Sequence, residues 1–151
     1  MTALRLESSA FSNGGEIPKK YGYKNGNVSP PLTINEIPSE CQSLVLIMDD
    51  PDAKAAVGKI WVHWVVWNIS SDVNEIQESS VPSNSMEGTT DFGEVGYGGP
   101  APPDKRHTYI FKLYALNTKL DIPSGADKNQ VENAIKNHII EETKLTGTYE
   151  P

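Results

Sequence analysis

The sequence predicts a mainly β domain, a sandwich of antiparallel strands on which one α-helix packs late in the chain. Short apolar runs with a two-residue period indicate the strands, and eleven prolines and twelve glycines separate these runs. Near the C-terminus the apolar residues instead recur at steps of three and four, which is typical of an amphipathic helix. A length of 151 residues suits a single domain, 1–151, with one hydrophobic core.

The first third of the chain predicts short strands around a loop. Leu4 and Leu6 alternate with charged residues, as in a strand at the edge of a sheet. Residues 21–31 hold two glycines and two prolines and predict an irregular loop, whereas residues 32–34 alternate again as a short strand.

The two clearest strands are 44–48 and 60–69, and an acidic turn joins them. The first is a continuous apolar run that ends in Asp49-Asp50-Pro51-Asp52, and the second is apolar on both faces except at His63 and Asn68. Because both of its faces look covered, the second strand is expected in the middle of a sheet. The two-residue period assigns to one of its faces Trp61, His63, Val65, Trp67 and Ile69.

Beyond these strands the pattern changes twice. Residues 73–85 are polar without a clear period and predict a loop or a helical turn. Residues 91–104 contain too many glycines and prolines for a helix or a central strand, so they predict a structured loop. The strict alternation over 107–116 predicts a third long strand, with His107 where the chain enters it.

The tail of the chain predicts the helix, over about 127–145. Asp127 and Gln130 resemble a capping box at its start, and Gly147 is a plausible stop signal. Its apolar stripe would pack on the sheets and consists of Val131, Ala134, Ile135, His138, Ile139 and Leu145.

The composition excludes several classes of function. Twenty acidic and thirteen basic side chains give a formal net charge of −7, and such a surface repels nucleic acids. No apolar run approaches the roughly 18 residues of a membrane span, and the first ten residues lack the apolar centre of a signal peptide. Cys41 has no partner for an internal disulfide, which suits a reducing compartment, so we expect a cytoplasmic protein.

Residues that could carry chemistry come from three separate segments. Asp50 belongs to the acidic turn, His63 to the second long strand and His107 to the start of the third. If these strands are neighbours, one carboxylate can meet both imidazoles and raise their affinity for a proton. Glycine amides of the loop around 98–99 would then complete a compact site for a small anion.

Each of these features also has an ordinary structural interpretation. A histidine on an apolar strand is often a satisfied core residue, and an Asp-Pro-Asp sequence is often a plain turn. The functional hypothesis therefore depends on the coincidence of all three segments. Two further hypotheses stay open, namely an acid–base hydrolase that uses Asp50, His63 and His107, and a metal site made of the same two histidines and the aspartate.

Four ordered motifs resemble those of one protein family. They read L-I-M-D-D-P-D-A, W-V-H-W-V-V-W-N-I, G-Y-G-G-P-A-P-P and R-H-T-Y-I-F-K-L-Y-A-L. Together they resemble the phosphatidylethanolamine-binding protein family, also called Raf kinase inhibitor proteins, and in particular its short bacterial and archaeal branch. The resemblance covers nearly the whole chain, and four motifs in order are far more specific than any single one.

The resemblance implies a Greek-key antiparallel β-sandwich of two sheets, with a C-terminal α-helix, short additional helical turns and a small anion pocket at one end. It implies that this pocket takes phosphate-type head groups or similar small anions, without a cofactor or a metal. The family's ligand-binding positions fall on Asp50, Asp52, Ala53, His63, Tyr97, Gly98, Gly99, Pro100, Pro102, His107 and Tyr109.

Three features differ from the family pattern. Lys54 stands where a proline usually follows the D-P-D-A motif, and Arg106 precedes His107 where the family has an arginine after the histidine. The sequence also ends at Pro151, without the longer C-terminal segment that closes part of the pocket in eukaryotic members, so a more open pocket is expected.

The leading functional hypothesis is therefore a non-enzymatic protein that binds phosphate, phosphoethanolamine or a similar small anion. The resemblance adds a regulatory role like the inhibition of a kinase or a protease. The sequence names neither the physiological ligand nor a protein partner, and it leaves open whether the chain forms a homodimer.

Overall fold

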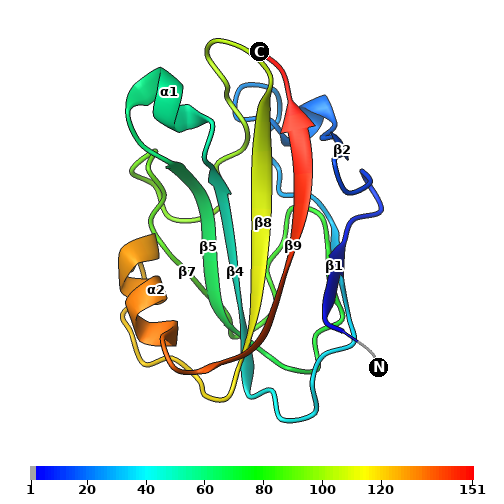
Figure 1. Ribbon diagram of the computed structural model, residues 1–151, viewed down its shortest axis with the longest axis vertical. Coiled ribbons are helices and arrows are strands. Elements are labelled where there is room, and N and C mark those ends of the chain that lie inside the picture. Colours follow the sequence, from blue (N-terminus) through cyan, green and yellow to red (C-terminus); the bar gives the residue numbers. More distant parts are fainter. Residues whose placement is uncertain (1–2) are drawn as a thin grey trace.

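Two β-sheets face each other in the computed structural model, which describes residues 3–151 (Figure 1). The larger sheet has the order β2-β9-β8-β4-β5-β7 and the smaller one β1-β3-β6. The strands are β1 (Arg5–Glu7), β2 (Gly15–Glu16), β3 (Leu32–Asn35), β4 (Ser43–Asp50), β5 (Trp61–Ile69), β6 (Glu75–Ile76), β7 (Met86–Glu87), β8 (His107–Leu116) and β9 (Ile139–Tyr149). The helical segments are the 3₁₀ turn η1 (Lys19–Tyr21) and the α-helices α1 (Ala53–Val57) and α2 (Lys128–Ile135).

This architecture confirms the predicted mainly β sandwich with two sheets and a late helix. All long strand pairs are antiparallel, and only the two-residue pairing of β2 with β9 is parallel. The strand order is not sequential, because β8 lies beside β4 although β5, β6 and β7 come between them in the chain. None of the helices in the described part of the chain is long and apolar enough to cross a membrane.

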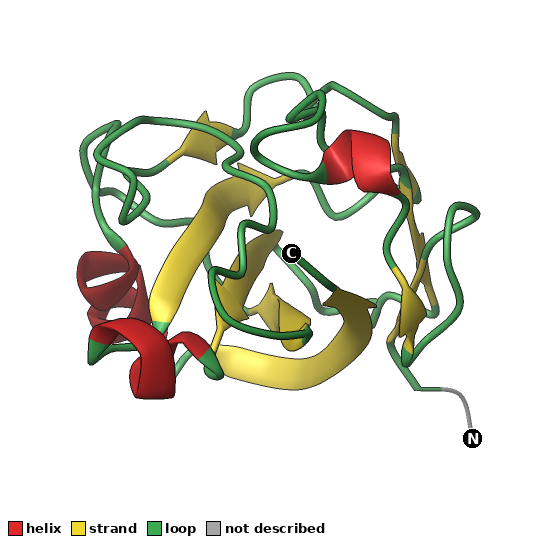
Figure 2. Cartoon of the chain, turned by 90° about the horizontal axis from the view of Figure 1, so that it is seen from above, coloured by secondary structure: helices red, strands yellow, loops and turns green. Residues whose placement is uncertain are grey.

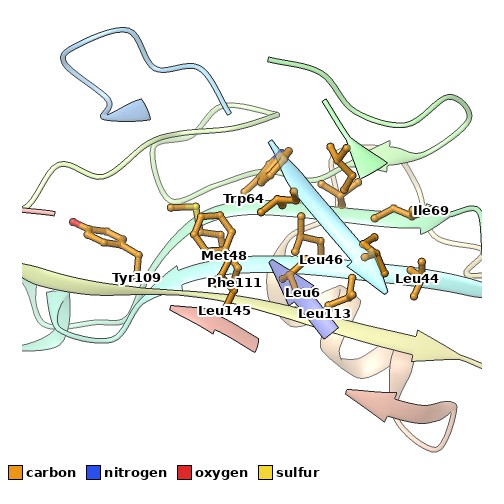
Figure 3. Packing of buried hydrophobic residues seen from close by; sticks show 14 of the residues in the cluster. Leu6, Leu44, Leu46, Met48, Trp64, Ile69, Tyr109, Phe111, Leu113 and Leu145 are labelled. Atoms are coloured by element: carbon orange, nitrogen blue, oxygen red, sulfur yellow. The ribbon is translucent and has the colours of Figure 1, made fainter. Parts of the chain in front are cut away.

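The main hydrophobic core lies between the two sheets (Figure 3). Alternate residues of β4 point into it, among them Leu44, Leu46 and Met48, whereas Val45 and Ile47 point to the opposite face. A second core forms there, where α2 covers β4 and β5 with Val131 and Ile135. Seen from above, the sheets enclose the space between them and both α-helices lie at the same side (Figure 2).

Strand β8 follows its predicted alternation without interruption. Tyr109, Phe111, Leu113 and Ala115 are fully buried in the main core, and the residues between them are less buried. Ten residue pairs join β8 to β9. The regular register carries His107 to the end of the sheet at which β4 finishes.

Strand β5 does not follow a simple two-residue period. Met48 pairs with Trp64 and Asp49 pairs with Val62, so His63 occupies the extra position of a β-bulge. A second register shift near Asn68, whose φ is 55°, reverses the faces again. As a result Val65 and Trp67 lie in the core under α2, and the prediction that they share a face with Trp61, His63 and Ile69 is wrong.

The predicted helix over 127–145 is correct only in its first half. The capping box forms as expected, because Asp127 accepts a hydrogen bond from the Gln130 amide and the Gln130 side chain accepts one from the Asp127 amide. Helix α2 ends at Ile135, and the chain turns through Asn137 at φ 68°. Residues 139–149 form β9 instead, because the open edge of β8 offers them ten backbone partners. The polar stretch 73–85 likewise contains the short strand β6.

Candidate functional site

The ends of three neighbouring strands gather the candidate site at one end of the large sheet. Asp50 is the last residue of β4, and it pairs across the sheet with Trp61 at the start of β5. On its other side β8 begins at His107. A strand end lets a carboxylate sit against a core without interrupting a ladder of backbone hydrogen bonds, and Asp50 is only 3% exposed.

His107 is held between two carboxylates. Its Nδ1 lies 2.6 Å from Asp50 Oδ2 and its Nε2 lies 2.7 Å from Asp104 Oδ1. Burial alone would lower the pKa of His107, but the hydrogen bonds to Asp50 and Asp104 outweigh it and raise that pKa above its ordinary value. The imidazolium form therefore donates both ring N–H groups, and neither is free for a ligand while Asp104 stays in place.

His63 has a different environment from the one expected. The bulge in β5 directs its ring toward the glycine-proline loop, where Nδ1 lies 2.7 Å from the Gly98 carbonyl oxygen. A carbonyl only accepts, so Nδ1 carries the proton, and burial lowers the pKa of His63 below its ordinary value. The neutral ring leaves Nε2 as the nitrogen available to the pocket. The structure thus joins Asp50 to His107, and it gives His63 a backbone partner in place of Asp50.

A pocket of about 210 Å³ opens beside Asp50 and His63. Its other walls are mostly carbon, and they are formed by Ala53, Val57, Trp61, Phe92, Ala101 and Pro103. Three buried polar atoms at or behind these walls have no hydrogen-bond partner in the described part of the chain, namely Asp50 Oδ1, Trp61 Nε1 and Tyr109 Oη. Buried polar groups are normally satisfied, so atoms of this kind at a pocket indicate a ligand or water position.

Tyr109 is fully buried near Asp50 and does not itself line the pocket. Burial, with the neighbouring Asp50 carboxylate, raises the pKa of Tyr109 far above its ordinary value, so the hydroxyl keeps its proton. The edge of its ring packs against His63, with the two ring centroids 5.2 Å apart. The hydroxyl is therefore a neutral donor or acceptor placed near both the acid and the imidazole.

The glycines of the loop serve close packing, and their amides are already in use. Gly98 N–H donates to the His63 carbonyl at 2.8 Å, and Gly99 N–H donates to Asn27 Oδ1 at 2.7 Å. The expectation that these two amides complete an anion cup is therefore wrong. A Cβ on Gly98 would lie 2.5 Å from the Phe92 ring, and one on Gly99 would lie 2.0 Å from the Tyr21 carbonyl oxygen.

The remaining positions expected at the site divide into wall and support. Ala53 lines the pocket directly. Asp52 is exposed and accepts the Thr108 amide at 2.8 Å, which ties the start of α1 to β8. The Tyr97 hydroxyl donates to the Tyr21 carbonyl at 2.8 Å. Pro100 and Pro102 are buried, and the Pro100 carbonyl accepts the Tyr23 amide.

Sequence reasoning missed four residues that shape this site. Trp61 and Phe92 supply its aromatic walls, and their rings meet edge-on with centroids 5.6 Å apart. Asp104 holds the second nitrogen of His107, and Asn27 holds the loop at Gly99. Trp61 was detectable, since the two-residue period places it on the same face as His63, whereas no local pattern identifies Asn27 or Asp104 as a partner of the site.

A larger hollow of about 430 Å³ lies on the other side of β5, between α1 and the start of α2. Lys54, which replaces the proline of the family motif, lines it together with Lys59 and Lys128. Lys59 is paired with Asp91 at 2.8 Å and Lys128 with Asp49 at 2.8 Å. These charges are largely neutralised, and the hollow contains none of the unpartnered buried atoms, so we assign the site to the smaller pocket.

Asn27 is predicted to set the position of the pocket wall. Its φ of 55° is tolerated by asparagine, and its side chain accepts the Gly99 amide. We expect Asn27→Ala to shift the Gly99 amide resonance and to raise the protease sensitivity of the loop, because both the acceptor and the tolerated backbone conformation are lost. Asn27→Asp keeps the acceptor and should restore both properties; if Asp and Ala behave alike, this contact does not position the wall.

A comparison with known protein families identifies the family to which the chain belongs. The model of the phosphatidylethanolamine-binding protein family matches residues 7–150. The chain belongs to this family. The matched span contains all three strands that form the site, as well as the loop that carries Asp104 and the glycines.

Several known proteins resemble this member of the phosphatidylethanolamine-binding protein family over nearly their full length. UPF0098 proteins of Methanothermobacter thermautotrophicus and Chlamydia muridarum are each 42% identical to it, over 97% of the chain and 98% and 99% of their own lengths. Among solved structures, a homologue of this family from Chlamydia trachomatis is 40% identical, with a TM-score of 0.93 over 100% of the chain and 99% of the homologue. The Escherichia coli protein YbcL is 29% identical, with a TM-score of 0.91 over 99% of both chains.

Proposed function

We propose that this chain is a non-enzymatic binding protein whose pocket takes a small anion of the phosphate-ester or carboxylate type. The observation that supports this most is the group of unpartnered buried atoms beside His63, with Asp50 Oδ1 and Trp61 Nε1 on residues that line the pocket and Tyr109 Oη behind them. Two donors, one acceptor and one titratable nitrogen match a tetrahedral phosphate that carries one proton. The carbon-lined walls then hold the organic substituent of the ester.

The positive charge that balances this anion comes from a proton that His63 takes up on binding. In the free protein its ring is neutral, because burial lowers the pKa of His63. A bound anion next to Nε2 stabilises the imidazolium and raises that pKa. Between the free and the bound pKa, affinity therefore falls as pH rises, by at most about tenfold per pH unit.

The experiment is a titration followed through the histidine ring signals by NMR. Phosphate or phosphoethanolamine should shift the signals of His63 and His107 and move the pKa of His63 upward. His138, whose Nδ1 is hydrogen-bonded to Asn117 beyond the far end of β8, is the internal control and should not move. Sulfate keeps its charge over this pH range, so its affinity isolates the protein's titration from that of phosphate. Unchanged signals of both His63 and His107 at saturating ligand would refute the proposal.

The same pocket would also carry the regulatory role of the protein. Exposed Val57, 51% accessible, borders the mouth beside the glycine-proline loop. The bound ligand and the rim of the pocket would together form the surface that a protein partner contacts, as in a regulator that inhibits a kinase or a protease. A cytoplasmic location suits the single buried Cys41.

A hydrolase is the second candidate, and one observation favours it. His63 has Nδ1–H fixed by a carbonyl and Nε2 open to the pocket, which is how a general base is oriented. His107 cannot take that role while both of its nitrogens are engaged. Turnover of p-nitrophenyl phosphate or p-nitrophenyl acetate that disappears in His63→Gln would support catalysis. For the metal hypothesis, the described residues contain no group of three His, Cys, Asp or Glu side chains arranged to hold an ion.

A further inference from the structure

Asp104 occupies the outer nitrogen of His107 in the way a bound anion would. Its Oδ1 lies 2.7 Å from Nε2, opposite the 2.6 Å contact between Nδ1 and Asp50. We propose that Asp104 is an internal competitor for the ligand anion, and that its carboxylate must leave His107 before an anion can reach that ring. This inference rests on the proposed anion-binding function and specifies what controls its affinity.

The two carboxylates on His107 differ in how firmly they are held. The Asp50 side chain is 4% exposed at the end of β4, whereas the Asp104 side chain is 42% exposed. Asp104 lies in the exposed run 103–106 that links the loop to β8, three residues from its partner. Exposed ion pairs are weak, because holding two side chains in one geometry costs conformational entropy. The outer carboxylate, that of Asp104, is therefore the one that can exchange.

His107 is not among the residues that line the pocket, and Asp104 occupies its outer nitrogen. His107 is fully buried, while Ala101 and Pro103 of the same loop form the nearby wall. Rotation of the Asp104 side chain toward solvent uncovers Nε2–H, a charged donor that Asp50 keeps protonated from behind. An anion that binds there replaces one carboxylate by another negative group, so the charge balance of the imidazolium is preserved.

Competition of this kind predicts the direction in which the affinity for an anion changes when Asp104 is replaced. When a binding-competent state is only partly populated, the apparent affinity falls by that fraction. Removing an exposed competitor of this strength should therefore tighten binding of an anion by about two- to sixfold. A merely structural role of Asp104 predicts the opposite, because a loosened loop would weaken binding.

The test measures the affinity of inorganic phosphate and of sulfate by calorimetry for the wild type, Asp104→Asn and Asp104→Ala. Both variants should bind about two- to sixfold more tightly than the wild type. Asp121→Asn, which removes an exposed carboxylate elsewhere, is the control for net charge and should bind like the wild type. In parallel, the pKa of His107 should fall in both Asp104 variants, because one hydrogen-bonded carboxylate is lost.

The outcomes separate this inference from the proposed function. Equal or weaker binding by both Asp104 variants, with a wild type that does bind, overturns the competitor role and leaves the anion site standing. A gain of the same size in Asp121→Asn also overturns it, because the effect would then be one of overall charge. Absence of binding by all four proteins, with unmoved histidine signals, overturns the anion-binding function and the competitor role together.

Discussion

Asparagine in place of Asp50 is expected to lower the free energy of unfolding by about 3 kcal/mol near pH 6.5, the lower end of what a broken buried ion pair costs. The reason is the complete burial of His107, which loses its inner carboxylate and keeps only the exposed Asp104. Urea denaturation followed by tryptophan fluorescence measures this directly. Asp52→Asn is the matched control, since that carboxylate is exposed and, among the described residues, accepts a hydrogen bond from the Thr108 amide alone, so it should cost less than about 1 kcal/mol.

The pH dependence of the same variant identifies the histidine responsible. A raised pKa in the folded state means that His107 stabilises the fold fully below its unfolded pKa of about 6.5, and that this stabilisation is lost as pH rises through the folded pKa. His63 has a lowered pKa and acts only below about 6.5, where its contribution is lost as pH falls. Wild-type stability should therefore decline above pH 6.5, and Asp50→Asn should flatten this decline. A variant that keeps the full slope would show that another group titrates.

Alanine in place of Gly99 is expected to destabilise the protein by about 3 kcal/mol, because the added methyl group meets backbone. The ideal Cβ would lie 2.0 Å from the Tyr21 carbonyl oxygen and 2.9 Å from Gly22 and Tyr23 backbone atoms. Backbone held in a packed loop cannot move aside as a flexible side chain can. The change should also displace the adjoining wall at Ala101 and weaken phosphate binding along with stability.

Gly93→Ala is the control for this substitution. Gly93 has a positive φ of 83°, but nothing lies within 4 Å of its added Cβ. Only the cost of a left-handed alanine remains, about 1 kcal/mol. Thermal denaturation of the two variants should thus rank Gly99→Ala well below Gly93→Ala; the reverse order would mean that the close approach at Gly99 is not what the fold requires.

The contacts of Gly99 show why the loop could be recognised but not explained from sequence. Its glycines and prolines predicted a structured loop near the site, and the loop is there. Anion binding by glycine amides was the simplest chemistry for such a motif. The Gly98 and Gly99 amides instead donate hydrogen bonds to the His63 carbonyl and to Asn27, and Asn27 lies 72 residues away in sequence from Gly99. No local pattern encodes a partner at that separation.

The C-terminal segment illustrates a conflict between local period and sheet pairing. The capping box at Asp127 is a local feature, and it was read correctly. Residues 139–149 also offered apolar steps that continue a helix, although their threonines and isoleucines favour a strand. In the fold these residues form a strand, because the edge of β8 pairs with ten of them and a helix would gain no comparable stabilisation.

By itself the sequence determined which side chains face the core along β8 and that acidic residues follow the apolar run of β4, because these features depend on short-range periodicity and turn chemistry. Tertiary structure alone decided that His63 sits in a bulge with a carbonyl partner, and that Asp104 closes the outer side of His107. A one-residue register shift changes which face a side chain occupies, and it is set by the neighbouring strand. The protonation of the two histidines follows from these partners, so the electrostatics of the pocket were fixed only when the chain folded.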